Sequence, residues 1–139
     1  MEKNKAIVRR FIEAYNKHDL TSIEDFIAPD YFDPDYPQLQ ELEELKQMMK
    51  LFFIAFPDFH ETIEDIIAEG DKLWVLLTYT GTHTGEGLGI APTGKKITCV
   101  AVDIYRIVND KIGWGRRFPT PDLAFFKQLG VIEYTEKGK

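Results

Sequence analysis

Cysteine is nearly absent from this chain of 139 residues, in which Cys99 is the only one. With a single cysteine, the chain can form neither an internal disulfide nor a cluster of thiolate metal ligands. Cys99 lies in the apolar run ITCVAVDIY, where no neighbouring residue has the character of a base. We expect a small, buried side chain there rather than a nucleophile.

An excess of positive charge is missing as well. The 17 basic residues are outnumbered by 23 acidic ones, which gives a net charge of −6. Such a charge repels phosphate backbones and anionic membrane surfaces, so neither nucleic acid nor a membrane is expected as a partner.

Long hydrophobic runs are lacking too. No stretch of about 18 apolar residues offers a membrane span, and the start MEKNKAIVRRF lacks the apolar region of a secretory signal. The chain nevertheless contains 44% hydrophobic and 13% aromatic residues, which is too apolar for a disordered protein. We expect a single soluble, cytoplasmic domain over residues 1–139, with a frayed tail at 133–139.

Helical periodicity dominates the first part of the chain. Apolar residues at spacings of three and four predict amphipathic helices over residues 5–17 and 41–56. Between them the capping-box pattern TSIE predicts a short helix that begins at Thr21 and stops at Pro29. Residues 30–38, DYFDPDYPQ, have the proline pattern of a loop.

The period changes to that of strands from residue 59 onward. Two extended runs joined by the turn EGDK, and two more joined at NDK, predict two antiparallel hairpins. The glycine-rich stretch GEGLGIAPTGKK connects two strands and lacks the helix N-terminus that a phosphate-binding loop needs. DLAFFKQLG predicts a last short helix, with Asp122 as its N-cap and Gly130 at its C-cap. Helices followed by strands favour an α+β domain whose sheet curls around the helices.

Six segments of the chain carry a family resemblance: IVRRFIEAYN, FIAPDYFD, AFPDF before IEDIIAEGDK, TYTGTHTGEGLGIAPTGKKIT, VDIYRIVNDKI and QLGVI. Their order and spacing resemble those of the SnoaL-like polyketide cyclases in the nuclear transport factor 2 superfamily. The resemblance implies a cone-shaped, strongly curved antiparallel sheet wrapped around the N-terminal helices, with an apolar pocket for a small carbonyl compound. It also implies aldol-type cyclisation or related proton transfer without a cofactor, and a homodimer formed through the outer face of the sheet.

The resemblance places acid/base chemistry on an aspartate of the last strand and a histidine of the strand before it. The histidine position falls on Asp103 in VDIYR. The last-strand ending, His-x-Asp in the family, falls on Gly115 and Arg117 in KIGWGRRF. A guanidinium stays protonated and cannot take a proton, so Asp103 is the candidate base and Arg117 its electrostatic partner. A shift of one residue would exchange Arg117 for Arg116.

Strand alternation places Cys99, Ala101, Asp103 and Tyr105 on one side of their strand. A carboxylate among apolar neighbours needs a partner, and the two arginines can reach Asp103 across the hairpin. This contact is either a functional pair or a plain structural ion pair. The alternative function is a non-catalytic binding module that lost the family's aspartate and holds an anionic small molecule through the arginine.

Aromatic side chains supply the candidate pocket lining. The candidate ligand-binding residues are five aromatics and one histidine: Tyr15, Phe53, Phe56, Trp74, His83 and Tyr105. For each aromatic taken singly, packing in the core is the favoured interpretation, although a concave sheet would let some of them line a cavity. His83 in TGTHTGEG is either a proton carrier at the pocket mouth or a brace for its loop. No histidine spacing suits a metal site.

The last strand carries an apolar row on one face. By alternation Ile112, Trp114 and Phe118 share a face opposite to Arg117. Apolar rows on an outer face commonly mark an interface, so this row supports the homodimer that the resemblance implies.

Overall fold

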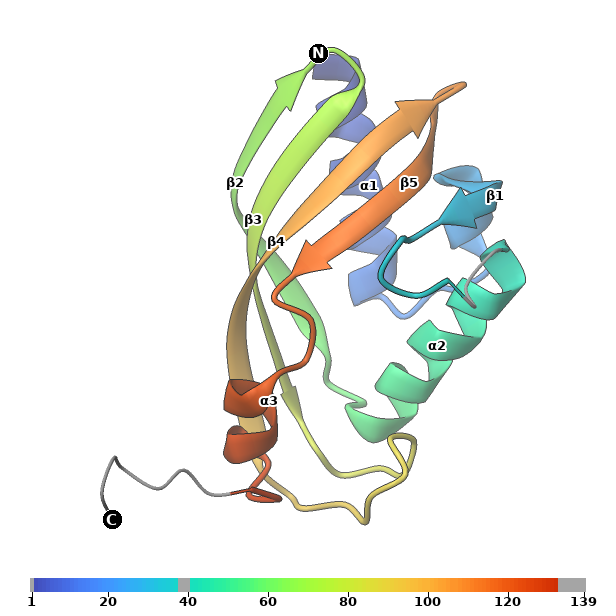
Figure 1. Cartoon of the computed structure of the whole chain (residues 1–139). Coiled ribbons are helices and arrows are strands. Elements are labelled where there is room, and N and C mark those ends of the chain that lie inside the picture. The colour runs from blue at the N-terminus through green and yellow to red at the C-terminus, as the bar shows by residue number, and fades with distance from the viewer. Residues whose placement is uncertain (1, 38–40, 133–139) are drawn as a thin grey trace.

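The computed structural model describes residues 2–37 and 41–132. Their elements follow the chain in this order: α1 (Glu2–Asn16), a 3-10 helix η1 (Ser22–Asp25), β1 (Ile27–Phe32), α2 (Leu42–Ala55), β2 (His60–Glu69), β3 (Lys72–Thr82), β4 (Lys96–Val108), β5 (Lys111–Phe118) and α3 (Leu123–Gln128). The strands form one curved sheet in the order β1-β5-β4-β3-β2, with α1 packed against β2 and α2 against β1 (Figure 1).

The predicted α+β fold, with a curved sheet around the helices, is confirmed. The two predicted antiparallel hairpins are β2–β3 and β4–β5, and β3 also pairs antiparallel with β4. The sheet is mixed rather than wholly antiparallel, because β1 pairs parallel to β5. None of the helices in the described part of the chain is long and apolar enough to cross a membrane.

Strand β1 is the element that the sequence pattern did not predict. The short helix is η1, which ends before Pro29, and Thr21 makes no side-chain capping bond. Asp19 takes over this role, since its carboxylate accepts bonds from the Ser22 backbone N–H and hydroxyl. Pro29 lies inside β1, where it is tolerated because β1 is an edge strand with one free side.

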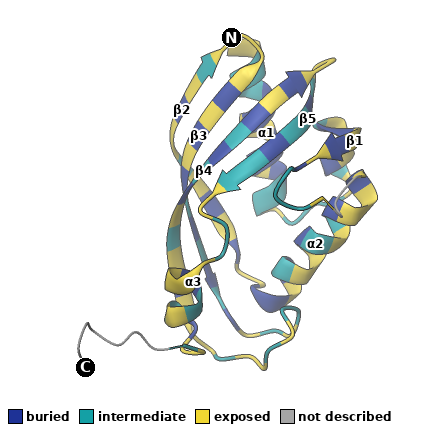
Figure 2. Cartoon of the chain, in the orientation of Figure 1, coloured by how far each residue is buried: buried dark blue, intermediate teal, exposed yellow. Residues whose placement is uncertain are grey.

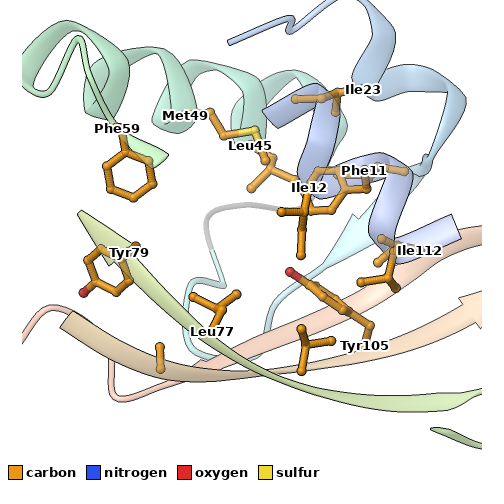
Figure 3. Close-up of a cluster of buried hydrophobic side chains, with 14 of the residues drawn as sticks. Phe11, Ile12, Ile23, Leu45, Met49, Phe59, Leu77, Tyr79, Tyr105 and Ile112 are labelled. Carbon is orange, nitrogen blue, oxygen red and sulfur yellow. The ribbon is translucent and has the colours of Figure 1, made fainter. Parts of the chain in front are cut away.

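The core lies between the concave face of the sheet and the two long helices. Burial alternates along the strands, whereas each helix buries one stripe (Figure 2). Phe11 and Ile12 of α1 meet Leu45 and Met49 of α2 above the sheet (Figure 3). Fully burying one such side chain stabilises the fold by about 1.5–3 kcal/mol. This packing sets the spacing between the helices and the sheet.

A β-bulge in β5 changes the face on which Ile112 lies. The register with β4 skips Gly113, so Ile112 turns into the core and is 0% exposed. Trp114 and Phe118 remain on the outer face, which makes the predicted row wrong at Ile112. Simple alternation cannot reveal an inserted residue, although a glycine within a strand often marks one.

The last helix begins as predicted. The Asp122 carboxylate accepts bonds from the backbone N–H groups of Ala124 and Phe125, as an N-cap does. Gly130 follows the helix with a φ of 76°, the left-handed conformation that favours glycine at this position. The predicted frayed tail at 133–139 lies outside the described residues.

Candidate functional site

A pocket of about 140 Å³ lies between the sheet and the helices α1 and α2. A cavity of roughly 10–15 Å³ already holds one water molecule, so this one has room for a small organic molecule. Its apolar side chains are Phe11, Leu45, Met48, Met49, Phe52 and Phe59. Its tyrosines are Tyr15, Tyr31, Tyr36, Tyr79 and Tyr105. Its charged groups are Asp33, Glu61, Asp103, Arg116 and Arg117.

Asp103 and Arg117 form a two-point ion pair across the β4–β5 ladder. The two residues are direct partners in the register. Arg117 Nε lies 2.6 Å from Asp103 Oδ1, and Arg117 Nη2 lies 2.9 Å from Oδ2. The Tyr105 hydroxyl donates a third bond to Oδ2 at 2.6 Å, and Asp103 is only 2% exposed. The predicted contact between Asp103 and one of the two arginines is therefore confirmed for Arg117.

Glu61 on β2 is a third member of this cluster, which the sequence analysis missed. Arg117 Nη2 donates to Glu61 Oε2 at 2.5 Å, so two buried carboxylates share one guanidinium. Burial raises the pKa of Glu61 above its usual value, and Arg117 counteracts this rise only in part. The sequence pattern could have revealed Glu61. It lies two residues from Phe59 and two from Ile63, and residues two apart on a strand share one face, here the inward one.

Arg117 is held in its charged form by both carboxylates. Burial alone would lower the pKa of Arg117, but Asp103 and Glu61 outweigh this effect and hold it well above its usual value. The guanidinium also lies 5.1 Å from the ring centre of Tyr79, within reach of a cation–π contact. Arg117 is therefore a permanent positive charge in the middle of the cluster.

Arg116 belongs to a different pair. Its Nε and Nη2 donate to the two carboxylate oxygens of Asp35, at 3.0 and 2.8 Å. This hydrogen bonding lowers the pKa of Asp35. Asp33, two residues away, is buried and lines the pocket, and burial raises the pKa of its carboxyl. The sequence left open whether Arg116 or Arg117 is the partner of Asp103. The structure shows that it is Arg117.

Tyrosine hydroxyls provide neutral donors in the pocket. Burial raises the pKa of both Tyr15 and Tyr31, so each keeps its proton. No hydrogen bond from either hydroxyl is found within residues 2–37 and 41–132. Gly115 makes room for Tyr31, because a Cβ at this position would lie 2.3 Å from the Tyr31 hydroxyl oxygen. These two hydroxyls remain available to a bound molecule.

Only two of the predicted ligand-binding residues, Tyr15 and Tyr105, line the pocket. Phe53 and Phe56 are buried in the core beside it, outside the lining. Trp74 lies on the outer face of the sheet with 48% of its surface exposed, because Leu73 and Val75 take the inner positions on β3.

His83 braces its loop instead of lining the pocket. It is 0% exposed, and its Nδ1 accepts a bond from the Thr93 backbone N–H at 3.2 Å. Its own backbone exchanges bonds with Gly94 and Lys95 at the other end of the loop. In the part of the chain that the structure describes, no group of three or more His, Cys, Asp or Glu side chains is arranged to hold a metal ion.

Comparison with a family model described as SnoaL-like polyketide cyclase gives a match over residues 5–124. The chain belongs to this family. Two aklanonic acid methyl ester cyclases, AcmA of Streptomyces galilaeus and DauD of Streptomyces sp. strain C5, are each 30% identical to it over 138 residues. The alignments cover 94% of this chain and 92% of AcmA, and 95% of this chain and 84% of DauD.

Solved structures show the same SnoaL-like architecture. AclR of Streptomyces galilaeus has a TM-score of 0.82 at 27% identity, covering 99% of this chain and 87% of AclR. TsrD of Streptomyces laurentii has a TM-score of 0.83 at 22% identity, covering 94% of this chain and 97% of TsrD, a likeness that shows the fold alone. Within this fold, Arg117 stands where the resemblance expects an acidic residue, and its guanidinium bonds to Asp103 and Glu61.

Proposed function

We propose that this SnoaL-like protein binds a small, neutral carbonyl compound in the pocket and catalyses proton transfer of the kind that begins an aldol-type ring closure. The observation that carries the proposal is the buried cluster of Asp103, Glu61 and Arg117 inside a largely apolar pocket. The two curated relatives named above are cyclases of a methyl ester, which supports the same class of chemistry.

The cluster and its neighbours supply what this chemistry needs. A carboxylate must remove a proton next to a carbonyl, and hydrogen-bond donors must stabilise the negative charge that develops on the carbonyl oxygen. The pocket contains carboxylates and also neutral donors, since the hydroxyls of Tyr15 and Tyr31 are unengaged within the described residues. Apolar walls exclude water, which strengthens both effects.

The charge balance favours a neutral ligand over an anionic one. Arg117 already pairs with Asp103 and Glu61, and Asp33 adds a third carboxyl to the same lining. Arg116 is occupied by Asp35. Among the described residues that line the pocket, an anionic ligand would therefore meet carboxylates and no unpaired cation, which weakens the alternative of a binding module that holds an anion through an arginine.

A hydrogen-exchange experiment tests the proposal. The probe is 2-tetralone, a neutral bicyclic ketone whose α-protons exchange with D₂O through its enolate. Shifts of the tyrosine ring signals in NMR spectra report binding, and loss of the α-proton signal reports catalysis. We expect binding together with exchange faster than in buffer alone. Binding without faster exchange would refute the enzyme and leave the binding module.

We also propose a homodimer formed through the outer face of the sheet. The exposed apolar side chains of this face include Trp74, Val100 and Phe118, which are 48%, 58% and 45% exposed. Exposed apolar side chains that share one face of a sheet are typical of an interface.

A further inference from the structure

The two carboxylates that share Arg117 are not equivalent. Both oxygens of Asp103 accept bonds from Arg117, and Oδ2 also accepts one from the Tyr105 hydroxyl. Glu61 bonds to Arg117 through Oε2, and within the described residues no hydrogen bond to its Oε1 is found. Both oxygens of Asp103 are thus engaged and its carboxylate is held in place, whereas Glu61 keeps an oxygen without a bond, which can accept a proton.

The position of Glu61 is fixed by its backbone. The Asn16 side chain at the end of α1 donates to the Glu61 carbonyl at 2.8 Å and accepts from the Glu61 N–H at 2.7 Å. This pair of bonds ties the start of β2 to α1, so the carboxylate projects from a rigid segment. Glu61 is 3% exposed and lines the pocket.

The groups around Glu61 come from every neighbouring element. They are Tyr15 of α1, Tyr79 of β3, Asp103 and Tyr105 of β4, and Arg117 of β5. Burial raises the pKa of Glu61 and makes its carboxylate a stronger base than one in water. Arg117 limits this rise.

We propose that Glu61 is the general base of this protein and that Asp103 is a positioning residue, which holds Arg117 between the two carboxylates. This inference rests on the proposed function. Glu61 takes a proton from the carbon next to the substrate carbonyl, the C–H bond breaks, and its electron pair moves onto the carbonyl oxygen. A hydroxyl of Tyr15 or Tyr31, or the Arg117 guanidinium, stabilises this enolate.

Ring closure then returns the proton. The enolate carbon forms a C–C bond with a second carbonyl carbon of the same molecule, and the proton on Glu61 moves to the new alkoxide. The carboxylate is restored, and the reaction is an isomerisation that consumes no co-reactant. Glu61 thus supplies on β2 the base that the resemblance expects on the last strand, where this chain has Arg117.

The test compares Glu61→Gln with the wild-type protein in the 2-tetralone exchange assay. Glutamine keeps the shape of glutamate and an oxygen that can accept a bond from Arg117, so tetralone binding should change by less than about twofold. Loss of a general base should slow exchange by about 10²–10⁴-fold. Wild-type exchange should also fall as the pH decreases through the pKa of Glu61, and this limb should vanish in Glu61→Gln.

Matched variants separate the possible failures. Glu64→Gln changes an exposed glutamate of the same strand and should exchange like the wild type. Glu61→Asp keeps a carboxylate, so it should recover part of the exchange rate and the decrease of this rate at low pH. If Glu61→Gln still exchanges at the wild-type rate and with the same pH dependence, the proposed role of Glu61 is wrong, whereas the proposed function still stands. Wild-type protein that binds tetralone without exchange would overturn the proposed function, and the inference with it.

Discussion

Replacing Arg117 with methionine should leave two buried carboxylates without their shared partner. Asp103 and Glu61 are 2% and 3% exposed, so water compensates for the lost guanidinium only in part. Removing one partner of a buried ion pair costs about 3–5 kcal/mol, because the remaining charge stays buried and uncompensated. Methionine fills most of the volume of the arginine stem, so this loss reflects charge rather than a cavity.

The effect of Arg117→Met should depend on pH, with a sign set by Glu61. Burial raises the pKa of Glu61 in the folded protein, and Arg117 opposes that rise. Without Arg117 the folded-state pKa rises further above the unfolded value of about 4.3. The stabilisation linked to this raised pKa is complete below the unfolded value and is lost as pH increases through the folded value. The variant should therefore lose stability, relative to the wild type, as the pH rises above this unfolded value.

Urea unfolding of both proteins, at a pH near the unfolded pKa of glutamate and at a higher pH, measures the effect. The matched control is Arg116→Met, which removes an equivalent guanidinium from the partly exposed pair with Asp35 and should destabilise far less. Equal losses for the two variants, or a loss for Arg117→Met that does not change with pH, would refute the reasoning about the buried cluster.

Three further substitutions test separate parts of the structure. Asn16→Ala removes both bonds to the Glu61 backbone and should cost about 1–3 kcal/mol in urea unfolding, at about 0.5–1.5 kcal/mol per bond. Gly115→Ala should weaken tetralone binding, because its Cβ would displace the Tyr31 hydroxyl, and adding Tyr31→Phe should restore part of the affinity. Trp74→Glu should convert a dimer into a monomer in light scattering, whereas Ile54→Glu at an exposed site on α2 should not.

Elements with a strong local period could be predicted from the sequence. The helices α1 and α2 and the four strands β2 to β5 carry repeats that follow directly from which face they bury. Strand β1 could not be predicted, because it is short, contains Pro29 and is held by pairing with a distant strand. The face of Ile112 was missed for a related reason, since the bulge at Gly113 exists only in the register with β4.

Only the part of the candidate site that lies within one hairpin could be predicted from the sequence. Asp103 and Arg117 lie on the two strands of one hairpin, so a count of residues from the turn brings them together. Glu61 reaches the same guanidinium from β2, which is separated from β5 by two intervening strands. Only the curvature of the sheet and the length of the arginine side chain close that distance, and neither can be read from alternation.

The cluster also explains how the family's fold can carry an arginine on its last strand. The resemblance expects a histidine at position 103 and an aspartate at position 117, so this chain has its carboxylate and its positively charged side chain on exchanged strands. The cross-strand pair survives this exchange because Asp103 and Arg117 still face each other, at 2.6 Å. What the exchange removes is a carboxylate with an unbonded oxygen, since Arg117 and Tyr105 engage both oxygens of Asp103. A second carboxylate within reach of Arg117 therefore has a chemical purpose as well as an electrostatic one, and among the described residues bonded to Arg117, Glu61 is the acid with an oxygen to spare.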